Sequence, residues 1–191
     1  MRWINNLKIG TRLISAFIIV ALLTGLVGVI GIINIKTVDK DYSALYINYG
    51  MAAGDLGHVG MSFHNMRATV RDLMLKDTSK ERETYLTKLK TIDGDLDAYL
   101  VKFEASIQSE GIRTALNSFN EALKEYEVVR EQVIDLLKED KLVEAKTLFY
   151  GAASQPATVA NDNLDKLIKL METEGTQKSD EYSASTTQAM N

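Results

Sequence analysis

Three basic side chains share one face of an expected helix and could bind an anion. His64, Arg67 and Arg71 are spaced by three and four residues, which places them in one stripe along a helix. Two arginines at this spacing repel each other by a few tenths of a kcal/mol unless an anion lies beside them. Because a guanidinium group binds a carboxylate through two parallel hydrogen bonds, the pair predicts an anion clamp. The alternative is that both arginines pair with Asp55, Asp72 or acidic residues of neighbouring helices and only solvate this face.

The same stripe begins with small residues at Gly50, Ala53, Gly57 and Gly60. Glycine inside a helix costs about 1 kcal/mol relative to alanine, so several glycines on one face disfavour a face that meets only water. Close approach of another helix explains them, most simply the same helix of a second subunit, and predicts a homodimer. A flexible hinge near the membrane is the alternative.

Other residues that carry chemistry do not form an enzyme site. His58 and His64 are six residues apart and lie on different faces of a helix, so they cannot chelate one metal ion. The sequence contains no Glu-x-x-His pair and no glycine-rich phosphate loop. The acidic cluster at Asp93, Asp95 and Asp97 lacks the ligand spacing of a calcium-binding loop and is expected on a solvated helix face. We therefore expect no catalytic residue, no metal and no cofactor.

An uncharged segment separates a basic N-terminus from an acidic remainder. The chain has 191 residues and a net charge of -4, yet no acidic residue precedes Asp39. Arg2, Lys8 and Arg12 precede the uncharged segment, while all 26 acidic residues follow it. The acidic remainder would repel phosphates, so nucleic acid is not an expected partner.

Residues 13–35 are expected to form a transmembrane helix. They carry no charge and are rich in Ile, Leu, Val and Gly, and about 20 such residues in a helix cross a hydrocarbon core of about 30 Å. A cleaved signal peptide and a buried core helix are the alternatives. The apolar region of a signal peptide is about 7–15 residues long and ends in a small-residue cleavage site, which is missing here. Basic residues gather on the cytoplasmic side of a membrane, and Trp3 fits an interfacial anchor. Residues 1–12 are therefore expected in the cytoplasm, and residues 36–191 outside the inner (cytoplasmic) membrane, in the periplasm or extracellular space.

The remaining sequence predicts helices almost throughout, because Pro156 is the only proline of the chain. Apolar residues recur every seven positions in two rows, a pattern typical of bundle packing. The rows are Leu45, Ala52, Val59, Met66 and Leu73, and Tyr49, Leu56, Phe63 and Val70. Since no turn signal separates these rows from the apolar segment, one helix is predicted from about residue 13 to residue 76.

Turn and cap signals divide the rest of the chain into further helices. A capping box at Thr78 and Glu81 starts the second bundle helix, and Gly111 is expected to cap its C-terminus. Residues 138–141 form a polar turn, and Pro156 marks the start of the last helix, because proline is tolerated in a first helical turn. Four amphipathic helices joined by short turns predict an all-α, antiparallel up-down four-helix bundle, preceded by a transmembrane helix that is continuous with its first helix.

These features resemble the sensory region of bacterial methyl-accepting chemotaxis proteins, and in particular their four-helix-bundle class of ligand-binding domain. The resemblance lies in residues 6–12 of the basic N-terminus, the signal-anchor helix, residues 66–75 of the first bundle helix and the helix start at Gln155 and Pro156. It implies a receptor that dimerises through its first helix, binds a small attractant such as a carboxylate or an amino acid, and controls the kinase CheA through CheW. It also implies that a second membrane helix, a HAMP domain and a cytoplasmic coiled coil follow Asn191.

The resemblance further implies which residues bind the ligand. Arg67 and Arg71 match the spacing of two first-helix arginines that hold the ligand carboxylate in aspartate receptors. Gln155 and Thr158 lie where the fourth helix of those receptors contributes polar contacts. Ser62 stands in the place of a further arginine of those receptors, so the resemblance does not carry aspartate specificity with it.

Phe149 and Tyr150 precede the last helix and are expected either to wall the pocket or to pack in the core. A ligand in that pocket is expected to act by a small sliding or rotation of the fourth helix against the first. The same module could instead serve as the input of a histidine kinase or a cyclic-dinucleotide enzyme. A membrane-anchored helical scaffold without a ligand is the further alternative.

Overall fold

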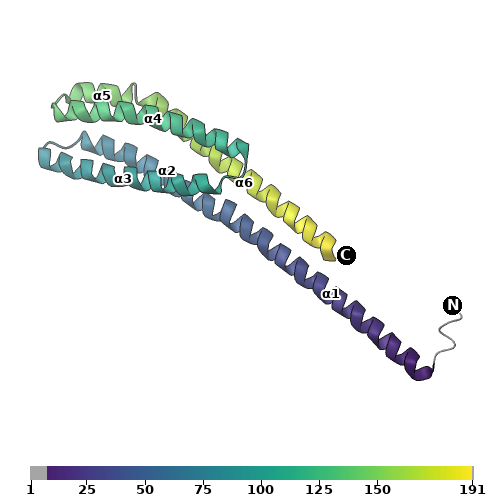
Figure 1. The fold of residues 1–191 in the computed structure, drawn as a ribbon. Coiled ribbons are helices and arrows are strands. Elements are labelled where there is room, and N and C mark those ends of the chain that lie inside the picture. Colours follow the sequence, from purple (N-terminus) through teal and green to yellow (C-terminus); the bar gives the residue numbers. More distant parts are fainter. Residues whose placement is uncertain (1–7, 191) are drawn as a thin grey trace. The chain divides into compact units, whose positions relative to one another are not determined.

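The computed structural model describes residues 8–190, and nearly all of them are helical. The helices in chain order are α1 (Ile9–Leu45), the π-helix η2 (Tyr46–Met51), α2 (Ala52–Leu73), α3 (Ser79–Ser106), α4 (Glu110–Lys138), α5 (Leu142–Tyr150) and α6 (Ser154–Met190). The six α-helices are labelled in Figure 1. Arg2 and Trp3, which entered the prediction of orientation, lie outside the described residues. The all-α class is as predicted.

The chain divides into two compact units. One comprises the residues up to Ala44 together with those from Ser179 onward, and the other comprises Leu45–Lys178 and contains the bundle. The bundle unit is therefore shorter at both ends than the sensor domain of residues 36–191 that the sequence predicts.

The apolar part of α1 is suited to lipid. Helical residues run from Ile9 to Leu73 without a break, and this helix is long and apolar enough to cross a membrane. No residue of α1 is buried, and large apolar side chains such as Phe17, Val27 and Ile35 are 69–70% exposed. A helix that is apolar on all sides is unfavourable in water and favourable in hydrocarbon. The predicted continuity between the apolar segment and the first bundle helix is confirmed.

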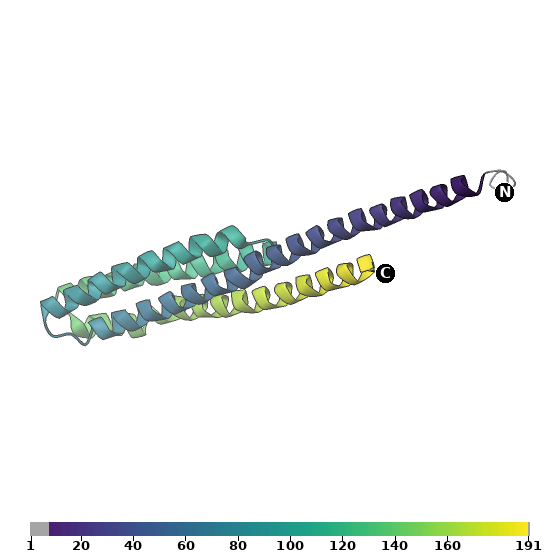
Figure 2. The same ribbon diagram turned by 90° about the horizontal axis from the view of Figure 1, so that it is seen from below.

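In the bundle unit, α2, α3, α4 and the first part of α6 pack around one apolar core, and successive long helices run antiparallel (Figures 1 and 2). The two predicted rows of α2 face this core, and their buried members are Ala52, Leu56, Val59, Phe63, Met66, Val70 and Leu73. Phe63 contacts the rings of Phe119 and Tyr126 in α4 edge-on, with centroids 6.0 and 5.8 Å apart. Such aromatic pairs contribute about 0.5–1.5 kcal/mol beyond the area that they bury. The seven-residue pattern therefore identified the core face of α2.

Side-chain caps set two of the helix starts. The Thr78 hydroxyl accepts a hydrogen bond from the Glu81 N–H at 3.3 Å and donates to the Glu81 carboxylate at 2.7 Å, as the capping box predicts. The prediction that Gly111 caps the second bundle helix is wrong, because Gly111 lies in the first turn of α4. Ser109 caps that helix by accepting from the Ile112 N–H at 3.2 Å. A serine oxygen satisfies a free N–H group at a helix start, and this contact places the boundary before the glycine.

The two later turn signals of the sequence, at residues 138–141 and at Pro156, are confirmed. Helix α4 ends at Lys138, and Asp140 takes a positive φ of 60° in the turn that follows. Pro156 lies in the first turn of α6, which begins at Ser154. Proline needs no hydrogen-bond partner for its nitrogen at this place.

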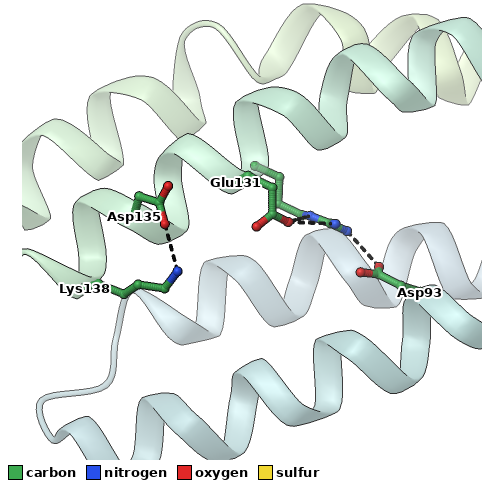
Figure 3. A network of polar contacts seen from close by, with 5 residues as sticks. Asp93, Glu131, Asp135 and Lys138 are labelled. Atoms are coloured by element: carbon green, nitrogen blue, oxygen red, sulfur yellow. Dashed lines mark hydrogen bonds and ion pairs between the residues drawn. The ribbon is translucent and has the colours of Figure 1, made fainter.

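Asp95 and Asp97 of the acidic cluster in α3 are exposed, as the sequence predicts, whereas Asp93 is half-buried and turns to α4. Asp93 accepts a hydrogen bond from Arg130 Nη1 of α4 at 2.7 Å, and Glu131 accepts from Nη2 of the same guanidinium at 3.0 Å (Figure 3). Arg130 is only 6% exposed, so its buried charge depends on these carboxylates. Burial raises the pKa of the neighbouring, half-buried Glu127, although Arg130 opposes this shift.

Two glycines allow α2 and the π-helix η2 to approach α6 closely. Helix α6 lies beside α2 in Figure 2. A Cβ atom at Gly60 would lie 2.9 Å from Leu164 Cδ2 of α6, and one at Gly175 would lie 3.3 Å from Tyr49 Cβ. Carbon atoms in favourable contact are about 3.5–4.0 Å apart. A side chain at Gly60 would therefore displace the end of Leu164, and one at Gly175 would press against Tyr49.

This packing corrects one of the residues assigned to a dimer face. Gly60 is buried against α6 of its own chain, so its close approach is intramolecular. Gly50, Ala53 and Gly57 are exposed in the single chain, and a Cβ atom at Gly57 would meet no atom within 4 Å. The stripe of small residues therefore has an exposed part, Gly50, Ala53 and Gly57, and a buried part, Gly60.

Replacing Gly60 by leucine is expected to lower the free energy of unfolding by about 1–3 kcal/mol, because the new side chain must displace Leu164. Gly94→Leu adds the same side chain to an exposed position of α3 that lies in open space and outside the proposed dimer face, where the gain in helix propensity makes it neutral or stabilising. Denaturant unfolding of the chain in detergent, followed by circular dichroism, measures both. Equal effects of the two substitutions would contradict the assignment of Gly60 to the α2–α6 contact.

Glu127→Gln is expected to stabilise the bundle at neutral pH. A carboxyl group whose pKa is raised on folding holds its proton more tightly in the folded chain, so the free energy of unfolding falls as the pH rises through its titration. The variant should melt at a higher temperature than the parent at about pH 7, and the two should converge at about pH 3.5, below the usual glutamate pKa of about 4.3. Glu125→Gln, an exposed position on the same helix, is the matched control. A difference that grows toward acid pH is the opposite outcome.

Candidate binding pocket

A pocket of about 330 Å³ opens in the bundle unit among α2, α4, α5 and the start of α6. It is lined by His64, Arg67, Ala68, Arg71, Tyr126, Phe149, Tyr150, Ala153, Ser154 and Ala157. Binding sites for small molecules usually have volumes of about 300–1,000 Å³, so this pocket suits a small solute.

Helix α2 contributes the charges of the pocket. Arg67 is half-buried, and its Cζ atom lies 5.7 Å from the centroid of the Phe63 ring, four residues earlier on the same helix. Arg71 follows one turn later and is more exposed, with Nε 3.8 Å from Asp72 Oδ1. No acidic side chain lines the pocket. The geometry therefore brings the two predicted arginines and His64 to one cavity, and the alternative pairing applies only to Arg71 and Asp72.

The two aromatic residues at the end of α5 form one wall. The rings of Phe149 and Tyr150 meet edge-on at 84° with their centroids 5.1 Å apart. Tyr150 is 63% exposed, whereas Phe149 is half-buried and also packs against the apolar core. Tyr150 therefore forms part of the pocket wall, and Phe149 both lines the pocket and packs against the core.

Tyr126 of α4 is a lining residue that sequence reasoning missed. It is 1% exposed, and its hydroxyl group has no hydrogen-bond partner among the described residues. Burial raises the pKa of Tyr126 to about 12, although the charges of Arg67 and Arg130 oppose this shift. The phenol therefore stays protonated at neutral pH and can donate a hydrogen bond. Its place in an apolar row of α4 made it look like an ordinary core residue, and only the hydroxyl group could have marked it.

The polar contacts expected from the last helix differ from those observed. Gln155 and Thr158 are exposed and do not line the pocket, and the Thr158 hydroxyl donates to the Ser154 carbonyl of its own helix at 2.9 Å. Ser154 and Ala157, one position earlier in each case, line the pocket instead. One residue is about 100° of rotation around a helix, which decides the face that a side chain occupies.

No three His, Asp or Glu side chains in the described part of the chain gather in a way that could hold a metal ion. The arrangement around the pocket instead offers cationic and neutral hydrogen-bond donors beside an aromatic wall. Its chemistry is that of a site for a small anion.

The fold defines an all-helical bundle module with an N-terminal helix that is long and apolar enough to cross a membrane. Residues 6–186 match a family described as a four helix bundle sensory module for signal transduction. The chain therefore belongs to this family of sensory modules, which are typically non-catalytic inputs and usually lie outside the cytoplasm. No curated protein and no solved structure matches the chain at a significant level.

Tyr126→Phe is expected to leave the ligand-free bundle as stable as the parent, or more stable by up to about 1 kcal/mol. A buried donor without a partner costs about 1–3 kcal/mol, and the substitution removes it. Thermal unfolding of the chain in detergent measures the change. Ser109→Ala is the contrasting control, because it removes a hydroxyl that caps α4 and donates to Glu174, and should cost about 1 kcal/mol. A loss of stability in Tyr126→Phe as large as in Ser109→Ala would show that its hydroxyl has a partner.

Proposed function

We propose that this chain is the ligand-sensing, membrane-anchored part of a chemotaxis receptor and that its pocket binds a small carboxylate. One observation carries the ligand class: two arginines, one helical turn apart, reach a cavity that no acidic side chain lines. Membership of a family of sensory modules supports the signalling role.

A carboxylate satisfies the groups that the pocket presents. A guanidinium group binds both carboxylate oxygens through parallel hydrogen bonds, and such charge-assisted bonds are stronger than neutral ones. The contact between Arg71 and Asp72 does not compete strongly, because both side chains are well exposed and exposed ion pairs at this distance are worth about 0–1 kcal/mol. Arg67 has no acidic neighbour in the pocket and is the main anchor of this proposal.

Signalling follows from the helices that the ligand would bridge. The pocket joins α2, through Arg67 and Arg71, to the start of α6, through Ser154 and Ala157. A ligand shifts the bundle only if it binds one arrangement of these helices more tightly than another. Leu164 of α6 packs onto Gly60 of α2, and a small sliding of α6 along this contact is the response that we propose.

The assembly that we propose is a homodimer in the inner membrane, with residues 1–12 in the cytoplasm and residues 36–191 in the periplasm or extracellular space. Gly50, Ala53 and Gly57 form the exposed small-residue face through which two copies of α2 and its preceding turn would meet. The cytoplasmic partners in this scheme are CheA and CheW. A histidine kinase or a cyclic-dinucleotide enzyme would use the same input module. The test that separates them is reconstitution of the receptor with CheA and CheW: added carboxylate would change CheA phosphorylation only if the receptor is a chemotaxis receptor.

Benzoate is expected to bind the chain in detergent, and Arg67→Ala is expected to weaken this binding about 10- to 100-fold, since a hydrogen bond to a charged group contributes about 1.5–3 kcal/mol. Isothermal titration calorimetry measures the affinity. Benzamide is the uncharged ligand control and should bind more weakly than benzoate. Arg113→Ala is the matched protein control, because Arg113 is exposed outside the pocket and pairs with Glu104 at 3.7 Å.

Equal affinity of benzoate and benzamide, or unchanged binding in Arg67→Ala, would remove the basis for a carboxylate site. If a folded chain binds no small carboxylate, including propanoate and 3-phenylpropanoate, the membrane-anchored scaffold becomes the better account.

A further inference from the structure

We infer that the pocket selects organic acids without an ammonium group and that amino acids are poor ligands. The inference rests on the proposed function, because it assumes that Arg67 and Arg71 hold a carboxylate. The proposed function names small carboxylates as ligands, and the inference selects one class among them, the organic acids without an ammonium group.

The charges that surround the cavity carry this inference. Every charged side chain that lines the pocket is an arginine, and no aspartate or glutamate lines it. The only acceptors among the lining side chains are neutral ones, the hydroxyl oxygens of Ser154, Tyr126 and Tyr150 and a nitrogen of His64. An amino acid whose carboxylate binds Arg67 would bring its ammonium group, two bonds away from that carboxylate, close to the same guanidinium groups. Like charges at such a distance repel strongly when water is partly excluded.

Two carboxylates interact with residues of the pocket, Asp72 with Arg71 and Asp93 with Tyr126. Asp72 lies beside Arg71 at 3.8 Å, and Asp93 accepts from the buried Arg130 at 2.7 Å. Neither lines the pocket. If Asp93 moved to meet a ligand ammonium, it would leave the charge of Arg130 buried with one partner fewer.

Tyr126 is a second and independent indication. Its hydroxyl group is buried without a partner in a residue that lines the pocket, and it is protonated at neutral pH. The hydroxyl hydrogen of this phenol lacks an acceptor, and an oxygen atom of a ligand would supply one. Side chains of Phe149, Ala153 and Ala157 add apolar surface, which suits an aromatic or short aliphatic body. The ligand class is therefore a small acid with an apolar body.

Two pairs of compounds that differ only in the ammonium group test this selection. They are 3-phenylpropanoate with L-phenylalanine, and propanoate with L-alanine. Calorimetric titration of the full chain in detergent is expected to show at least about tenfold tighter binding of the acid in each pair that binds. Tyr126→Phe is expected to weaken binding of 3-phenylpropanoate about fivefold or more, while its thermal unfolding without ligand shows that it is folded.

The outcomes separate the two levels of the proposal. Binding of phenylalanine or alanine as tight as that of its partner acid, with a loss in Arg67→Ala, would overturn the selection and leave the carboxylate site in place. Unchanged affinity in Tyr126→Phe would remove the tyrosine from the recognition. Binding that does not depend on Arg67, or no binding of any of the four compounds, would overturn the proposed function and the inference with it.

Discussion

The burial of one seam of α2 is the constraint on which the pocket depends. A helix that presents apolar residues every three and four positions has only one rotation that removes all of them from water. Phe63 fixes this rotation, because its fully buried ring meets Phe119 and Tyr126 of α4. Arg67 then follows four residues later, over the same ring. The polar stripe of α2 therefore faces α5 and the start of α6 as a consequence of core packing.

The bundle treats its buried and half-buried charges in two different ways. Arg130 is enclosed between α3 and α4 and is matched by Asp93 and Glu131, so its charge is satisfied within the chain (Figure 3). Arg67 and Tyr126 line a cavity instead, where no acidic side chain of the lining meets them, and the buried Tyr126 hydroxyl has no partner among the described residues. Buried polar groups in folded proteins are nearly always paired, and exceptions concentrate at functional sites. This contrast within one bundle is the ground on which we propose the pocket as a ligand site.

The pocket and the glycine contacts involve the same pair of helices. Leu164 of α6 packs onto Gly60 of α2, and Tyr49 of η2 packs onto Gly175 of α6. In the proposed function, a ligand that holds the start of α6 against α2 would act on the contact between these two helices. Helix shifts of about 1–2 Å are a common means of signalling between distant sites.

The sequence by itself determined the N-terminal helix that is long and apolar enough to cross a membrane, the helical class, the core face of α2, the capping box at Thr78 and the turn at Asp140. These features depend on local order or on the period of a single helix, which residue types set directly. It also placed Arg67 and Arg71 on one face. Only the tertiary structure decided what that face meets: Gly60 packs against α6, and Ser154 and Ala157 line the pocket in place of Gln155 and Thr158. Tyr126 joined the site for the same reason, because the rotation of each helix and the contacts across the bundle depend on the other helices, and no local pattern records them.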